Sequence, residues 1–128
     1  DAVMSATAFD KDGKVVRTLI DNAQIRVAFD KDGKVTTDKK SDFKTKAERG
    51  MDYGMLKVSK IQKEWFQQIA ALEEWMIGKT VDEIKAMKVK EVDAAHPSVP
   101  DIAELTSTVT ITVQDYIAAV AEAFQNKK

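Results

Sequence analysis

An eight-residue segment occurs twice near the start of the chain. Residues 8–15 and 28–35 share the sequence Ala-Phe-Asp-Lys-Asp-Gly-Lys-Val, with a spacing of 20 residues between the copies. Asp and Gly are what a tight hairpin with a residue at positive φ requires. Asp21-Asn22 supplies a further turn between the two copies. The repeat therefore predicts two successive hairpins, which together make a small antiparallel β-meander.

Three segments around these turns have the composition of β-strands. Residues 2–9, 14–20 and 24–29 are rich in β-branched and aromatic residues and show partial alternation of apolar and polar positions. In the third segment Ile25, Val27 and Phe29 share one face, while Arg26 points the other way. We expect these segments to form the sheet.

The Asp-x-Asp-Gly pattern also suggests a calcium loop, but the spacing argues against one. In an EF-hand loop the glycine is sixth and a bidentate Glu is twelfth. Counted from Gly13, the first and twelfth positions are Ala8 and Leu19, and the copy at Gly33 gives Ala28 and Lys39. Both loops lack both end ligands, so plain hairpin turns are favoured and we expect no metal site.

The clearest helix is predicted over residues 58–77. Its apolar residues recur at spacings of three and four and draw one stripe: Val58, Ile61, Trp65, Ile69, Leu72 and Met76. Ser59 is the expected N-cap, and Gly78 is expected to end the helix. Large aromatic side chains dominate cores, so Trp65 and Trp75 are predicted to lie in the core or at its boundary.

Two more helices are predicted further along the chain. Thr80-Val81-Asp82-Glu83 is a capping box, which predicts a short helix over 81–87. The last helix runs from about 106 to 126 and is helical at least from Thr112, where Thr112-x-x-Asp115 is a second capping pattern. The hydroxyl-rich residues 106–112 at the start of this helix have the composition of a strand, whereas the spacing of the apolar residues predicts a helix. Both alternatives stay open at this point.

Two stretches between these elements are predicted to be irregular. Residues 37–57 are polar and broken by glycines, and their lysines (Lys39, Lys40, Lys44 and Lys46) form either an anion-binding face or a solvated surface. Residues 88–101 contain both prolines, although Val89–Val92 could add an edge strand. The only histidine, His96, is expected in this loop without a catalytic role, because a site needs several convergent groups.

The composition of the chain argues against nucleic-acid binding, Cys-ligated metals and a membrane span. The chain has 128 residues, a formal net charge of −1 and no Cys. It therefore lacks the positive charge that a nucleic-acid partner requires, and it has no disulfide or Cys-ligated metal. No apolar run approaches the roughly 18 residues of a membrane span. The start at Asp1 suggests a trimmed or mature form whose export signal or lipid anchor is missing.

These patterns predict one α+β domain over residues 1–128. A small antiparallel β-meander would pack against two longer helices, with one short capped helix between them.

The second half resembles the bacterial FMN-binding domain family, which includes the flavin-carrying subunits of sodium-pumping quinone reductase and Rnf-type complexes. The resemblance rests on three motifs: Ile77-Gly78-Lys79-Thr80-Val81-Asp82-Glu83-Ile84, then Val92-Asp93-Ala94, then Asp101-Ile102-Ala103-Glu104-Leu105-Thr106-Ser107. The pattern is most similar to an uncharacterised secreted or lipoprotein branch. The resemblance therefore implies a bacterial cell-envelope or extracellular domain, membrane-anchored by a lipid on a missing N-terminal segment.

One departure from the family changes the expected chemistry. Flavinylated members attach FMN to a Thr, and the matching position here is Glu104, which has no hydroxyl to esterify. Asp101 adds a second negative charge. These carboxylates would repel the phosphate of FMN, because two like unit charges about 4 Å apart repel by about 4 kcal/mol at an effective dielectric constant of about 20. Covalent FMN is therefore not expected.

Noncovalent FMN binding remains as an expectation from the resemblance. The candidate ligands are Thr106, Ser107 and Thr108, if they open a helix whose free amides hold the phosphate, and Tyr53 with Gly54, where the family has a flavin-side loop. Tyr53 would stack on the flavin ring or simply pack in a turn.

Two functions stay open at this point. The first is a non-catalytic envelope domain that binds FMN or another small ligand reversibly, and the second is a structural or interaction domain that has lost flavin binding. An independent enzyme ranks below both, because no nucleophile–base pair, metal-spaced set or Gly-rich phosphate loop occurs.

Overall fold

The chain folds into one antiparallel hairpin and a set of short helices arranged around it. A computed structural model describes residues 1–128. The elements in chain order are β1 (Ala2–Phe9), β2 (Val15–Ala23), α1 (Lys46–Arg49), η1 (Gly50–Tyr53), η2 (Met55–Lys57), α2 (Trp65–Met76), α3 (Val81–Lys85), β3 (Val89–Lys90), β4 (Val99–Pro100) and α4 (Gln114–Gln125). This arrangement confirms the predicted α+β class, with a small antiparallel sheet against two longer helices and a short capped helix between them.

The hairpin forms around the first copy of the repeated segment. β1 pairs with β2 from Ala2 opposite Ala23 to Phe9 opposite Val15, with a bulge after Ala8. In the turn, the Asp10 carboxylate accepts hydrogen bonds from the backbone N–H groups of Asp12 and Lys14, at 2.9 Å each. Gly13 takes a φ of 76°, which the absence of a side chain permits. This turn is the one that the sequence predicts.

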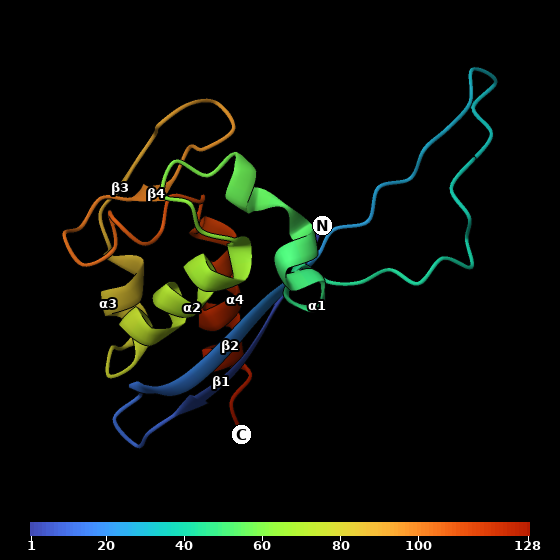
Figure 1. The fold of residues 1–128 in the computed structure, drawn as a ribbon. Helices are drawn as coiled ribbons and strands as arrows, with labels where there is room; N and C mark the ends of the chain where they lie inside the picture. The colour runs from blue at the N-terminus through green and yellow to red at the C-terminus, as the bar shows by residue number, and fades with distance from the viewer.

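The core lies between the inner face of the hairpin and the helices α2 and α4. α4 packs against β1 and α2 against β2 (Figure 1). Trp65 is 1% exposed, and its indole N–H donates to the hydroxyl of Tyr116 at 3.0 Å. This confirms the core position predicted for Trp65, while Trp75 is partly buried at the edge of the same core. The other fully buried hydrophobic side chains of the core are Val15, Leu72, Met76, Ile84, Val109, Val113 and Val120.

The third predicted strand does not join the sheet. Residues 24–28 make no ladder, and strand pairing beside the second copy of the repeat is limited to an isolated bridge between Phe29 and Val35. β2 continues through Asp21 and Asn22, so the turn predicted there does not form and the chain does not fold back beside β2. On the side of β2 away from β1, the Ile20 amide donates to the Glu73 carboxylate of α2 at 2.7 Å. Residues 24–44, which we call the arm, instead extend away from the body (Figure 1).

The helix predicted over 58–77 begins later than expected. α2 starts at Trp65, and its N-cap is Glu64 rather than Ser59. The Glu64 carboxylate is buried and accepts the amides of Met55 and Leu56 at 2.9 Å each, so it holds η2 against the start of α2. The predicted C-terminal end is close, since α2 ends at Met76 and Gly78 follows with a φ of 79°.

The predicted capping box at Thr80 is confirmed. The Glu83 amide donates to the Thr80 hydroxyl at 3.3 Å, and the Thr80 amide donates to the Glu83 carboxylate at 2.7 Å. The hydrogen bonds that the Glu83 carboxylate accepts from the Thr80 amide and, at 3.2 Å, from the Thr80 hydroxyl lower the pKa of Glu83. α3 ends at Lys85, slightly before the predicted end at residue 87. After it, Val89–Lys90 pairs with Val99–Pro100, so part of the suggested edge strand forms.

The last helix is shorter than predicted. α4 begins at Gln114, and its N-cap is Val113 without a side-chain cap. Thr112 does not cap it, because its hydroxyl accepts a hydrogen bond from the Ser98 amide at 3.4 Å. Residues 103–108 form turns, so the hydroxyl-rich entry is neither a strand nor a helix.

Candidate functional site

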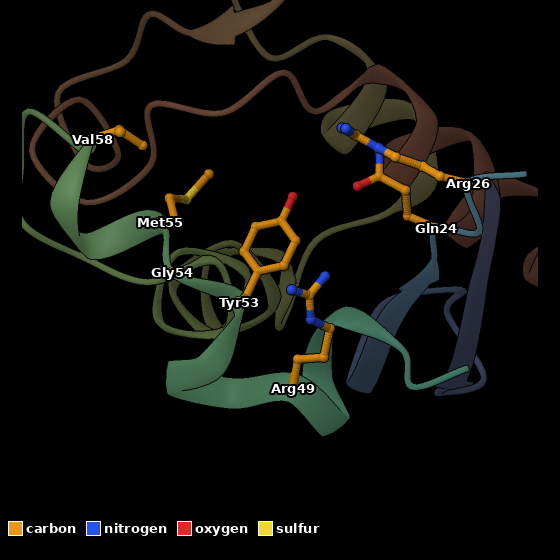
Figure 2. A pocket seen from close by; sticks show the side chains of 7 residues that line it. All are labelled: Gln24, Arg26, Arg49, Tyr53, Gly54, Met55 and Val58. Atoms are coloured by element: carbon orange, nitrogen blue, oxygen red, sulfur yellow. The ribbon is translucent and has the colours of Figure 1, made fainter. Parts of the chain in front are cut away.

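An open cavity lies between the base of the arm and the η1–η2 segment. Its volume is about 570 Å³, and its lining residues are Gln24, Arg26, Arg49, Tyr53, Gly54, Met55 and Val58 (Figure 2). Two of the predicted ligand-binding residues, Tyr53 and Gly54, are therefore in its wall. Cavities that bind small molecules commonly measure about 300–1,000 Å³, so this one has a suitable size.

The charged side chains of the cavity are all basic. Arg26 comes from the arm and Arg49 from the end of α1, so the two guanidinium groups approach from different segments. Neither is within ion-pair distance of a carboxylate, because the ion pairs of the chain are Lys90–Asp101 and His96–Asp93. Arg49 donates one hydrogen bond, from Nη2 to the Asp52 carbonyl at 3.5 Å. A guanidinium group without a carboxylate partner keeps further N–H donors in a planar fork that suits phosphate or carboxylate. The cavity thus presents positive charge to an anion.

The aromatic ring of Tyr53 lies among cations. The guanidinium carbon of Arg49 is 5.1 Å from the ring centroid, and the ammonium nitrogen of Lys46 is 5.3 Å from it. These are cation–π distances. Figure 2 shows the ring of Tyr53 between Arg49 and Met55, with the phenol oxygen directed into the cavity. A planar ligand would therefore meet the Tyr53 ring and the Arg49 guanidinium group at this wall, whereas Lys46 contacts the ring but does not line the cavity.

Local capping interactions hold this wall in place. The Glu48 amide donates to the Thr45 hydroxyl at 3.2 Å, and the Thr45 amide donates to the Glu48 carboxylate at 2.8 Å, which caps α1. Gly54 takes a φ of 81° between η1 and η2, where the chain changes direction. With the Glu64 contacts to η2, these bonds position Arg49, Tyr53 and Met55.

The other predicted ligand residues lie elsewhere. Thr106, Ser107 and Thr108 line neither this cavity nor the second one described below. They belong to a turn rather than the start of a helix, and the Thr108 hydroxyl donates to the Leu105 carbonyl at 3.3 Å. The structure therefore separates Thr106–Thr108 from the wall that holds Tyr53 and Gly54, and it gives them no helical N-terminus to offer a phosphate.

The position of Glu104 and Asp101 is on the surface. Both side chains are exposed, and Asp101 forms an ion pair with Lys90 at 2.8 Å. The ion pair neutralises Asp101, but it supplies no hydroxyl for a phosphoester at Glu104.

A second cavity of about 300 Å³ lies on the other side of η2. It shares Met55 and Val58 with the first cavity and includes Ser59, Asp93 and His96. His96 lies in the β3–β4 loop, as predicted, with its Nδ1 2.7 Å from the Asp93 carboxylate. This hydrogen bond is the main cause of the lowered pKa of Asp93. No hydrogen bond joins His96 to Ser59, whose hydroxyl oxygen accepts instead from the Lys63 amide and the Gln68 side chain.

Two further observations bear on cofactors and membranes. No group of three or more His, Cys, Asp or Glu side chains is arranged to hold a metal ion. None of the helices combines the length and apolar character that crossing a bilayer requires.

Comparison of the chain with models of known protein families, with curated proteins and with solved structures finds no match in any of the three. The resemblance to FMN-binding domains therefore stays a prediction from the motifs alone.

The sequence did not single out Arg26 and Arg49 as site residues. They are far apart in the chain and line the same cavity only because the arm leaves β2 beside α1. One signal was present: Arg26 alternates with the apolar Ile25 and Val27, which puts it on the opposite face of an extended segment.

Proposed function

We propose that this chain is a non-catalytic domain that reversibly binds a small aromatic anion in the cavity of Arg26, Arg49 and Tyr53. FMN is the first candidate, bound noncovalently, and the location we propose is the bacterial cell envelope. The family resemblance supports FMN and the envelope. The observation that carries the binding proposal is that Arg26 and Arg49, neither of which forms an ion pair with a carboxylate, line the same cavity as Tyr53.

The chemistry of the wall suits the two ends of such a ligand. Arg26 and Arg49 would bind the phosphate, since charge-assisted hydrogen bonds from guanidinium groups are roughly twice as strong as neutral ones. Tyr53 and the flexible thioether of Met55 would contact the flavin ring. Because the cavity is open to solvent, we expect exchange of the ligand rather than permanent retention.

A titration of FMN fluorescence with purified protein tests this proposal. We expect saturable quenching by FMN and weaker binding of riboflavin, which lacks the phosphate. The double variant Arg26→Met/Arg49→Met should lose at least about tenfold in FMN affinity, or about 1.4 kcal/mol, while its riboflavin affinity stays unchanged. Arg17→Met is a matched control, because Arg17 is exposed on β2 outside the cavity.

Tyr53→Leu separates the ring contact from the phosphate contact. This variant should weaken FMN and riboflavin alike, since both carry the same ring system. Equal affinities of the wild type and the double arginine variant for FMN would contradict the proposal.

The second candidate is a structural or interaction domain that has lost flavin binding. The observation that favours it is that Thr106–Thr108 line no part of the cavity whose wall includes Tyr53 and Gly54. Absence of saturable binding for FMN and riboflavin in the titration would select this alternative.

A further inference from the structure

The arm carries an apolar face that nothing in its own chain covers. Ile25 is 49% exposed, Val27 50% and Phe29 61%. Loops of this length without regular structure are uncommon and often functional, and an isolated two-stranded hairpin is marginally stable in water. The arm therefore has the composition of a segment that packs against another surface.

The apolar face and the ligand cavity use opposite sides of the arm. Gln24 and Arg26 line the cavity of their own chain (Figure 2), and Ile25, Val27 and Phe29 alternate with them. In extended backbone, alternate side chains point to opposite sides. The apolar face is thus free to make a contact while Arg26 remains in the cavity.

The internal repeat shows what such a face does elsewhere in the same chain. Phe29 corresponds to Phe9 within the repeat, and the same 20-residue spacing places Ile25 and Val27, which precede the repeated segment, at the positions equivalent to Ser5 and Thr7 of β1. Those three residues face the body: the Ser5 hydroxyl donates to the Ala119 carbonyl at 2.9 Å, and the rings of Phe9 and Phe124 are 5.0 Å apart. The copy on the arm is more apolar than its counterpart and has no such cover.

An apolar groove on the body offers a matching surface. It has a volume of about 510 Å³ and runs between the hairpin and α2, and most of its lining residues are hydrophobic, among them Met4, Leu19 and Phe66. Its charged lining residues are Asp21 and Glu73, both acidic. The arm carries six basic side chains (Arg26, Lys31, Lys34, Lys39, Lys40 and Lys44) and four acidic ones. Apolar character and charge are therefore complementary between groove and arm.

We propose that the apolar face of the arm docks in this groove of a second copy of the chain. The arm extends away from the body that carries it (Figure 1), so a partner molecule supplies the groove. Charge complementarity favours a second copy because one chain carries both halves of the contact: an apolar face on an arm with more basic than acidic side chains, and an apolar groove whose charged residues are Asp21 and Glu73.

Sedimentation velocity over a range from micromolar to millimolar protein tests this proposal. The wild type should change from monomer to a larger species as concentration rises. The arm variant Val27→Asp/Phe29→Asp and the groove variant Leu19→Asp should each stay monomeric. Val16→Asp is the matched control for the groove, since Val16 is also exposed on β2 but does not line the groove.

A mixing experiment identifies the two halves of the contact. The arm variant keeps an intact groove and the groove variant keeps an intact arm, so an equimolar mixture should associate although each variant alone does not. Circular dichroism checks that every variant is folded. A wild type that stays monomeric throughout, association that survives in the folded arm variant, or a mixture that stays monomeric would each overturn the proposal.

Discussion

The two copies of the repeated segment form the same turn in different surroundings. The Asp10 amide donates to the Lys14 carbonyl at 2.9 Å, and the Asp30 amide donates to the Lys34 carbonyl at the same distance. Around the first copy Phe9 packs on Phe124, and Val15 is 1% exposed. Around the second copy Phe29 is 61% exposed and the ladder stops after one bridge.

The comparison separates two requirements for a hairpin. Turn chemistry is local, so the same eight residues make the same turn twice. A lasting ladder also needs a covered face, because strand pairing without burial is marginal. The body supplies that cover to β1 and β2, and the monomer supplies none to the arm.

The largest expected difference between the copies is in amide hydrogen exchange. Asp10 and Asp30 have the same neighbouring residues, so their intrinsic exchange rates are alike and the ratio of measured rates reports protection directly. At protein concentrations too low for the arm to dock, we expect the Asp10 amide to exchange at least about 100-fold more slowly, equivalent to about 2.7 kcal/mol. Equal rates would show that the two turns are equally stable.

The matched substitutions Phe9→Ala and Phe29→Ala come next in size. Full burial makes Phe→Ala cost about 3–5 kcal/mol, and because Phe9 is only partly buried we expect about 2 kcal/mol. Phe29→Ala should change the free energy of unfolding by less than about 0.5 kcal/mol. Urea denaturation of dilute protein measures both. A loss for Phe29→Ala as large as that for Phe9→Ala would place the arm within the cooperative core.

The smallest expected effect concerns the covered edge of β2. Burial raises the pKa of Glu73, although the hydrogen bond from Ile20 and the charge of Arg17 act in the other direction. A carboxyl group whose pKa is higher when folded binds protons more tightly in the folded state, so its contribution to stability decreases as pH rises through the folded pKa. Glu73→Gln removes this titration and keeps an oxygen to accept the Ile20 amide.

We therefore expect the stability of the wild type relative to Glu73→Gln to decrease between about pH 4.5 and neutral pH. The change should be less than about 1 kcal/mol, since Glu73 is partly exposed and solvent screens its charge. Urea denaturation across this range measures it. If the stability of the wild type relative to Glu73→Gln increased with pH, folding would favour the ionised form of Glu73 and lower its pKa, which would contradict this prediction.

Local chemistry made part of this structure predictable. The turn at Asp10–Lys14 and the capping box at Thr80 follow from neighbouring residues, and both form as predicted. The start of α2 does not, because Glu64 is selected as N-cap by its contacts to the amides of Met55 and Leu56. The absence of residues 24–29 from the sheet likewise follows from tertiary pairing, because β2 continues to Ala23 opposite Ala2 and no turn forms at Asp21-Asn22.

The candidate site was predictable only in part for the same reason. The resemblance pointed to Tyr53 and Gly54, which line the cavity, and to Thr106–Thr108, which do not. The cationic half of the site consists of Arg26 and Arg49, which line one cavity only through the tertiary fold, and no local sequence pattern indicates that placement.

An NMR titration of isotope-labelled protein with FMN tests the central proposal most directly. We predict saturable shifts of the backbone amides of Gln24, Arg26, Arg49 and Tyr53–Val58, while Thr106–Thr108 stay unchanged. Shifts confined to residues 101–112, or no shifts at saturating FMN, would contradict the proposal that the unpaired arginines and Tyr53 form the ligand site.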